Sequence, residues 1–488
     1  MSAAWRRCLA LAALVAVAGA PHVAARPLVV LYESWLYLPH SYAMVSAMEI
    51  IHLLRLYGPE SAARQHRLSV VVREPPYFVA AWKRALVYDD AYNALLQHGV
   101  PAWDGASAVD VVLRRSYPHF INGWPGEADG VPLLLFYTSE LGAALPAASF
   151  SFAAGSPPPS AAAVAQRLGA PGLRLVTPSA WSARGAASYG RNATVVPHGV
   201  DGALFHRLPA ANREAVRTHL GLTPSDFLLL TVGAMTPNKG MAALLAALHA
   251  TVAGAGATHV KLLLKAMGHL YESRRWVEGY VAEVVRSLAA AGATSEGEGL
   301  EASVRGVLRE HVIFLDATLA SAELNELYNA ADLYAAPYVA EAFSMTPLEA
   351  LRAGLPVLAP HGGGAAEYLA QLAAAEAGAA DDERFIRFLR AQEGLLSGGE
   401  GKQVNMVQHG DVAEGLLAAV AATAGRTQAG GDGDTRPSEA AAARLAAVID
   451  AHWSWRAVAE RLMATFEEVT AAGAGRRAQQ RRATAAEL

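Results

Sequence analysis

Two spacings of apolar residues alternate along the chain and predict an α/β protein. PLVVLYES, residues 27–34, is a continuous β-branched run typical of a buried strand. YAMVSAMEIIHLLRLYG, residues 42–58, has helical spacing and ends on a glycine. Strand-like runs RLSVVV, VDVVLRRSYP and VPLLLFYT continue the series to residue 138. Such alternation favours a parallel sheet covered by helices.

A second series begins near Thr194. Its strand-like runs are TVVPHG, FLLLTVG, VKLLLKA, VIFLD, LYAAP and LPVLAP, with helical segments such as GMAALLAALHATVA between them. The intervening PAASFSFAAGSPPPSAAAV, residues 146–164, is rich in Pro, Ser and Ala and is expected to be an exposed loop. We therefore predict two Rossmann-like domains facing a central cleft, because ligands of open parallel sheets bind beyond the carboxyl ends of the strands.

Length fits this two-domain prediction, since 488 residues exceed the size at which one hydrophobic core keeps growing. We place the first domain at residues 26–190 and the second at 191–450. HWSWRAVAERLMATFEEV lies in a predicted closing helix, residues 451–470, whose Trp453 and Trp455 are expected to be packing anchors. Residues 471–488 are basic and are expected to form a disordered tail.

The first 25 residues have the pattern of a secretory signal. Arg6 and Arg7 precede a short apolar run, and small residues favour cleavage after Ala25. An uncleaved anchor and a transit peptide are the weaker alternatives. The signal predicts the secretory lumen or secretion, the cytosol being the alternative if the segment is not a signal, and Asn192 in Asn-Ala-Thr is then a glycosylation acceptor.

Charge and cysteine content exclude several classes of protein. Charged residues make up 17% of the chain and the net charge is -4, so nothing indicates a nucleic-acid partner. The single cysteine, Cys8, lies in the predicted signal, so the mature chain would have no disulfide and no cysteine metal site.

AEAFSMTPLEALRAGLPVLAP, residues 340–360, holds two glutamates on either side of a Thr-Pro step. Proline suits the first position of a helix, so we expect Thr346 to be the N-cap and Pro347 the first helical residue. Glu341 then lies in the preceding loop, and Glu349 takes the position of a capping box. Alternatively, both carboxylates accept hydrogen bonds from vicinal hydroxyls at the ligand-facing edge of the sheet.

This stretch resembles the Glu-x7-Glu signature of the retaining, nucleotide-sugar-dependent glycosyltransferases of family 4, which have the two-domain GT-B fold with a helix crossing back to the first domain. Other segments of the chain resemble the family in the same order: VTPSAWSARGAASYG, VVPHGVDGALFHR, VGAMTPNKG and LYNAADLYAAPYV. The resemblance covers residues 173–369 and reaches the first domain only by its general pattern.

The resemblance implies that Glu341 holds the donor sugar and Glu349 the ribose, and the second role is compatible with helix capping. It implies a nucleotide-diphosphate sugar as co-substrate, no cofactor, and an acceptor that is a glycan, protein or lipid. The leaving diphosphate would take the acceptor's proton, so neither a protein base nor a metal is demanded. Peripheral association with a membrane is also open.

Lys239, after Pro237 and Asn238, opposes the dipole of the helix that follows. With Asn238 as N-cap, a diphosphate on Lys239 and on the helix N-terminus would reverse that cost. The alternative is a solvent-facing lysine, but Gly233 and the family resemblance favour the phosphate site. Where the family commonly has arginine this chain has Ala234, and Lys265 either reaches the same phosphates or is exposed at its strand end.

Further candidates lie in two loops and at the acceptor side. HGGGAAE, with Gly362 and Gly363, lets backbone approach the nucleotide. The amides of Phe343, Ser344 and Met345 are expected to donate to sugar or phosphate.

On the acceptor side, His40 and Ser41 follow the first strand, with Ser41 as an N-cap or an acceptor contact. The family's first-domain histidine has no match, because Ser139 and Glu140 stand where it is expected and His119 comes too early. The first hypothesis is that the chain is a nucleotide-sugar glycosyltransferase of the secretory pathway. Ala234 and the missing histidine suggest a second hypothesis, a catalytically silent relative that binds nucleotide sugar or glycan. The third hypothesis is a phosphorylase or epimerase.

Overall fold

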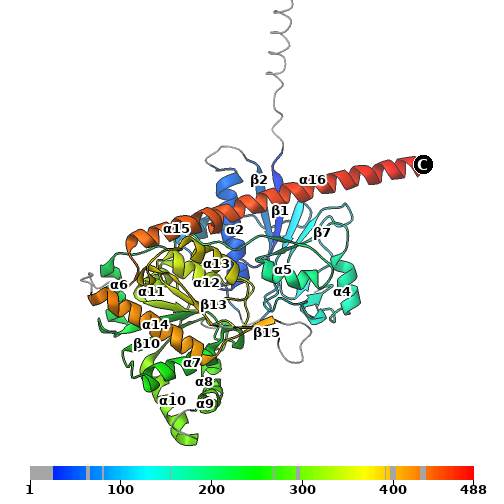
Figure 1. Cartoon of the computed structure of the whole chain (residues 1–488). Helices are drawn as coiled ribbons and strands as arrows, with labels where there is room; N and C mark the ends of the chain where they lie inside the picture. The colour runs from blue at the N-terminus through cyan, green and yellow to red at the C-terminus, as the bar shows by residue number, and fades with distance from the viewer. Residues whose placement is uncertain are drawn as a thin grey trace, which may run out of the picture.

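The computed structural model describes residues 26–61, 66–79, 82–153, 155–267, 270–292, 297–390, 392–395, 403–428 and 436–487. The predicted signal, residues 1–25, lies outside these ranges. Within them the chain forms two six-stranded parallel sheets, each covered by helices (Figure 1). The predicted α/β architecture of two Rossmann-like domains is confirmed. No helix in the described ranges has the length and apolar character needed to cross a membrane.

The first sheet has the strand order β2-β1-β3-β5-β7-β8. Its order reverses between β1 and β3, so this is where the carboxyl-end crevice opens. The strands are β1 (Leu28–Glu33), β2 (Leu68–Arg73), β3 (Val111–Arg114), β5 (Leu133–Phe136), β7 (Leu173–Thr177) and β8 (Ala193–Val195). Its helices are α2 (Ser41–Tyr57), α3 (Asp90–Gly99), α4 (Ala161–Leu168) and α5 (Ala180–Ala187), and β4 (His119–Phe120) pairs with β6 (Phe150–Ser151).

The second sheet has the order β11-β10-β9-β12-β13-β14, which reverses between β9 and β12. Its strands are β9 (Phe227–Val232), β10 (Val260–Ala266), β11 (Val312–Asp316), β12 (Leu333–Ala335), β13 (Val357–Pro360) and β14 (Ile386–Leu389). The helices are α6 (Ala210–His219), α7 (Met241–His249), α8 (Ser273–Gly279), α9 (Val281–Ala290), α10 (Gly297–His311), α11 (Ser321–Ala330), α12 (Met345–Arg352), α13 (Ala366–Ala375) and α14 (His409–Gln428). A hairpin joins β15 (Gln392–Leu395) to β16 (Gln403–Met406).

The chain crosses between the domains twice, at Val200 and at Ser454, and the two crossings pair as a parallel bridge. Helix α15 (Glu439–Trp453) packs on the second domain, and α16 (Trp455–Glu487) runs back along the first domain beside α2 (Figure 1). Trp453 belongs to the second core and Trp455 to the first, so both tryptophans are the predicted packing anchors.

Three boundaries differ from the sequence-based expectation. Strand β8, expected to open the second domain after residue 190, pairs with β7 of the first sheet, so the boundary lies further along the chain. Within the expected loop 146–164, Phe150 is buried and Ser160 caps α4. Helix α16 continues to Glu487 where a disordered tail was expected, because the Ala, Arg and Gln that follow are strong helix formers.

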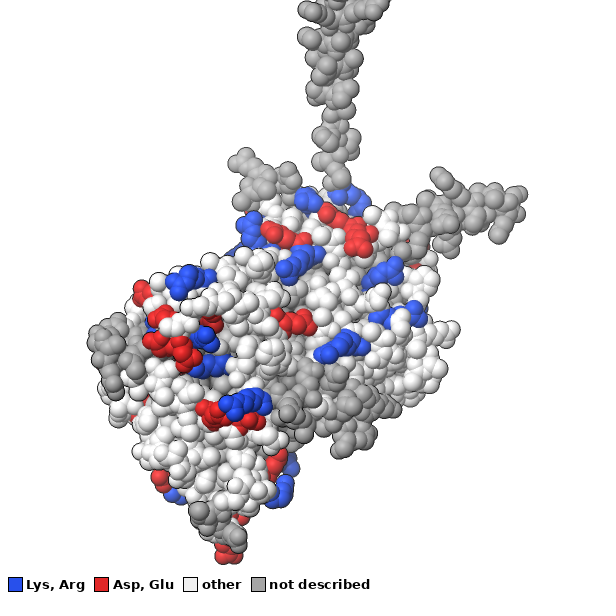
Figure 2. Space-filling model, viewed as in Figure 1, with Lys and Arg blue, Asp and Glu red and all other residues white. Residues whose placement is uncertain are grey.

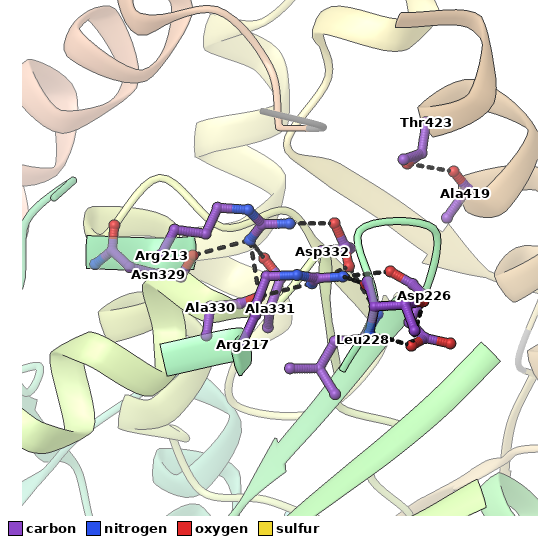
Figure 3. A network of polar contacts seen from close by, with 11 residues as sticks. Arg213, Arg217, Asp226, Leu228, Asn329, Ala330, Ala331, Asp332, Ala419 and Thr423 are labelled. Carbon is purple, nitrogen blue, oxygen red and sulfur yellow. Dashed lines mark hydrogen bonds and ion pairs between the residues drawn. The ribbon is translucent and has the colours of Figure 1, made fainter. Parts of the chain in front are cut away.

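A buried polar cluster anchors α6 to the second sheet. Asp332, at the start of β12, accepts hydrogen bonds from Arg213 (2.5 Å) and Arg217 (3.0 Å), and also from the N–H of Leu228 (2.7 Å) (Figure 3). The two arginines also donate to carbonyl oxygens at the end of α11, such as that of Ala330. The cluster therefore satisfies backbone groups that the helix end leaves open.

Candidate functional site

The switch point of the second sheet places the turn after β9, residues 233–240, beside Glu341, the first glutamate of the pair. The turn follows β9, and the Glu341 loop follows β12, which is the neighbour of β9 on the side where the strand order reverses. Both therefore lie where ligands of such sheets bind. The structure brings Lys239 and Glu341 together as an ion pair, and Gly233 donates its N–H to the Lys265 carbonyl oxygen at 3.0 Å.

Two glycines shape the turn after β9. Gly233 has a φ of 137°, and Gly240 a φ of 70°. A Cβ on Gly240 would lie 1.9 Å from the carbonyl oxygen of Pro337, so only glycine fits there. Gly240 is also the residue that precedes α7, and so the prediction of Asn238 as its N-cap is wrong.

Asn238 instead holds the neighbouring loop. Its carbonyl oxygen accepts the N–H groups of Val339 (2.9 Å) and Ala340 (3.2 Å). Its side-chain amide donates to Glu140 of the first domain at 3.3 Å. The turn after β9 therefore fixes the backbone just before Glu341 and also contacts the opposite domain.

Lys239 and Glu341 form an ion pair. The ammonium also lies 5.3 Å from the ring centroid of Tyr338. Burial lowers the pKa of Lys239, and the negative charge of Glu140 acts against that shift. A desolvated cation beside a carboxylate is suited to an anionic ligand with hydroxyls, because the lysine can pair with phosphate while the carboxylate accepts hydroxyl protons.

Lys265 and Glu349 are both buried and lie close enough to act on each other's charge. Lys265 is only 6% exposed, so the alternative of an exposed lysine is wrong. Burial lowers its pKa, and Asp316 and Glu349 oppose the shift. Burial also raises the pKa of Glu349 to about 7, against the opposing effects of the Tyr328 hydroxyl and Lys265.

The helix that carries Glu349 begins earlier than predicted. Helix α12 starts at Met345 after Ser344, which has a φ of 65°, so Thr346 is not the N-cap and Pro347 is the third helical residue. Proline is tolerated there because first-turn N–H groups have no intrahelical partner. The capping box is wrong as well: Glu349 accepts from the Tyr328 hydroxyl at 2.7 Å instead of turning back to the helix start.

The Glu341 loop continues through Phe343, Ser344 and Met345. Phe343 is buried between the rings of His198 (5.0 Å) and Tyr368 (5.2 Å). The Ser344 carbonyl oxygen accepts from the Tyr368 hydroxyl at 2.8 Å. Met345 opens α12, so its N–H is one of the groups left open at a helix start, as the predicted donor role requires.

The glycine-rich turn after β13 approaches protein backbone. Gly362 and Gly363 lie in it, Gly363 with a φ of 89°. The next residue, Gly364, donates its N–H to the Glu341 carbonyl oxygen at 2.8 Å, and a Cβ on it would lie 1.9 Å from the Ala342 carbonyl oxygen. The sequence indicated a close backbone approach but not that Gly364 makes it or that the Glu341 loop is the partner.

On the first-domain side His40, not Ser41, is the N-cap of α2, because its ring nitrogen accepts the Tyr42 N–H at 3.1 Å. Burial lowers the pKa of His40 to about 4. Its ring lies 6.5 Å from that of Tyr271 in the second domain. Trp82 likewise donates to the Leu270 carbonyl oxygen at 3.3 Å, so aromatic contacts join the domains here, a feature the sequence did not indicate.

One remaining candidate lies away from this centre. Asn192 is exposed just before β8, at the far edge of the first sheet. Among the described residues, no group of three or more His, Cys, Asp or Glu side chains is placed to hold a metal ion. Acidic and basic side chains are interspersed on the face shown in Figure 2.

Part of the second domain and the fold of the chain both resemble known proteins. Residues 226–387 match the family model described as Glycosyl transferases group 1. A D-inositol 3-phosphate glycosyltransferase of Kineococcus radiotolerans is 32% identical over 170 residues, which is 35% of this chain and 34% of that protein. The match thus spans about a third of the length of that relative.

Solved structures resemble nearly the whole chain. A glycosyltransferase from Rickettsia africae superposes with a TM-score of 0.54 at 13% identity, covering 91% of this chain and 99% of that one. HepE of Anabaena in complex with UDP-glucose gives a TM-score of 0.50 at 16% identity, covering 90% and 100%. The chain has the GT-B fold, and its second domain holds the match to the Glycosyl transferases group 1 model.

Proposed function

We propose that this protein is a glycosyltransferase that moves a sugar from a nucleotide-diphosphate sugar to an acceptor hydroxyl with retention of configuration. The observation that carries the proposal is the Lys239–Glu341 pair at the switch point of the second sheet. The family match of residues 226–387 covers this pair, and Glu349 lies in the same match.

In this proposal each group has a separate role. Lys239 and the start of α7 neutralise the diphosphate, and Lys265 adds a second buried cation near Glu349. Glu341 accepts hydroxyl protons of the sugar, and Glu349 those of the ribose. Charge that develops on the leaving diphosphate is stabilised by fixed positive groups, and the diphosphate itself accepts the acceptor's proton.

The first donors to test are UDP-sugars, because HepE, a protein of the same fold, was solved with UDP-glucose. Thermal-shift assays across UDP- and GDP-sugars would select the donor, since a ligand that binds only the folded state raises its melting temperature. Slow hydrolysis of that donor to free nucleotide diphosphate then measures turnover without an acceptor. We expect Glu341→Ala to abolish the hydrolysis and Lys239→Ala to reduce it about 100-fold.

Ala234 favours one competing function, the catalytically silent relative, because it removes a positive charge from the phosphate turn. Donor binding without turnover for any sugar would support that alternative. Turnover that depends on free phosphate would instead identify a phosphorylase.

We further propose that the chain enters the secretory pathway, on the basis of the signal pattern in residues 1–25. Expression in a eukaryotic cell, followed by N-terminal sequencing and glycosidase treatment, tests this proposal. A chain that begins after Ala25, and whose mass falls when the glycosidase removes a glycan from Asn192, would support it. A cytosolic chain with Met1 to Ala25 intact would contradict it.

A further inference from the structure

A carboxylate of the second domain caps a helix of the first domain. The Glu367 side chain, on α13, accepts the N–H of Ala180 at 3.0 Å and that of Trp181 at 2.7 Å. These N–H groups open α5, where a helix leaves its donors without intrahelical partners and its dipole favours negative charge. The contact can therefore form only while the two domains are closed on each other.

The residue before α5 contacts the Glu341 loop directly. Ser179 is 2% exposed, and its hydroxyl accepts the Ser182 N–H at 3.1 Å while donating to the Ala342 carbonyl oxygen at 2.5 Å. Ala342 is the residue after Glu341, and Gly364 holds the Glu341 carbonyl oxygen from the other side. The loop is thus held by Ser179 from the first domain and by Gly364 from the second.

Helix α5 is in turn tied to the edge of the first sheet. The N–H of Ser139, just beyond β5, donates to the Ser182 hydroxyl at 2.7 Å. The Trp181 indole donates to the Glu140 carbonyl oxygen at 2.7 Å. A displacement of the first sheet would therefore carry α5 with it and remove Ser179 from the Glu341 loop.

We propose that Glu367 and Ser179 are positioning residues that set the Glu341 loop when the domains close. The inference rests on the proposed function, because it assigns the loop to the donor sugar. Glu367 stabilises the closed arrangement, and Ser179 transmits it to the backbone on either side of Ala342. Since coupling between two events is reciprocal, a sugar held by the ordered loop also favours closure.

Glu367→Ala, Glu367→Gln and Ser179→Ala test the proposal, with Glu376→Ala as the matched control. Glu376 immediately follows α13, and its carboxylate accepts the Phe385 N–H at 2.8 Å, but both partners lie in the second domain. Circular dichroism and thermal unfolding would first establish that each variant is folded. Glu367→Gln, which keeps the side chain's shape, replaces Glu367→Ala if the alanine variant does not fold.

Two measurements need no ligand. Small-angle scattering reports domain closure, and hydrogen exchange of the peptide spanning residues 339–346 reports order in the loop. We expect Glu367→Ala to increase the radius of gyration and both Glu367→Ala and Ser179→Ala to speed exchange about tenfold in this peptide. Unchanged scattering and exchange in Glu367→Ala would overturn the proposal, as would equal changes in Glu376→Ala.

A third measurement connects the contact to the donor. We expect kcat/KM for UDP-glucose, or its affinity if no turnover occurs, to fall about tenfold in Glu367→Ala and in Ser179→Ala. Affinity for UDP, which lacks the sugar, should change less than about twofold. Equal losses for both ligands would contradict a role through the sugar loop. If the wild-type protein binds no nucleotide sugar, the proposed function fails, while scattering and exchange still decide the closure contact.

Discussion

Lys239 and Glu341 join the turn after β9 to the loop after β12 through an ion pair. Both side chains are largely buried, and Glu140 of the first domain also lies close enough to act on the charge of Lys239. A diphosphate would offer Lys239 a second anionic partner and leave Glu341 available to sugar hydroxyls. The pair therefore links the two halves of the proposed donor site.

Lys239→Ala is expected to reduce donor turnover about 100-fold, because a fixed charge on the leaving group is lost. Initial rates of nucleotide release measure the effect. Lys261→Ala is the matched control. Lys261 lies near the start of β10, at the other end of the strand from Lys265, and its ammonium donates to the Glu310 carbonyl oxygen. Equal losses in the two variants would contradict the assignment of Lys239.

Glu349 should make stability depend on pH. Its pKa is about 7 in the folded protein against 4.5 for an unperturbed group, so between these values the folded state holds one more proton than the unfolded state. The contribution of Glu349 to the free energy of unfolding is therefore greatest below about pH 4.5 and falls until about pH 7.

Glu349→Gln cannot ionise and should escape this loss. We expect wild type and variant to have similar free energies of unfolding near pH 5, and the variant to be more stable by up to about 3 kcal/mol near pH 8. Urea unfolding at both values measures the difference. A constant difference at the two values would contradict the raised pKa.

The Asp332 cluster should contribute to stability without acting in the site. Asp332→Asn removes the counter-charge of Arg213 and Arg217, and losing one partner of a buried ion pair costs about 3 kcal/mol. Chemical unfolding measures the loss. Glu301→Ala, which removes an exposed partner of Arg305, should change the free energy of unfolding by about 0.5 kcal/mol or less.

Sequence patterns predicted the parts of the molecule that depend on local periodicity. Apolar runs predicted the strands that end near Gly233 and Lys265, and the aromatic character of Trp453 and Trp455 predicted their packing role. The nearness of Lys239 to Glu341 follows from the carboxyl edge of a parallel sheet.

Contacts between distant segments account for what the sequence did not predict. Gly240 and not Asn238 precedes α7 because residues 237–239 form a separate 3-10 turn, and the Pro337 carbonyl oxygen leaves no room for a Cβ on Gly240. The carboxylate of Glu349 turns toward Tyr328, a partner on another helix, and Glu367 caps a helix in the other domain. None of these partners is visible in the local spacing of residues.

Ser344 has a φ of 65°, the only positive φ of a non-glycine residue in the described part of the chain. Its hydroxyl interacts with Tyr338, so a direct change to glycine alters two things at once. Comparing Ser344→Gly with Ser344→Ala removes the hydroxyl in both and leaves only the backbone effect. Because a Cβ is disfavoured at positive φ, Ser344→Gly should be more stable than Ser344→Ala by about 1 kcal/mol, measured by urea unfolding. If alanine proves equally stable, the loop does not keep Ser344 in this conformation in solution.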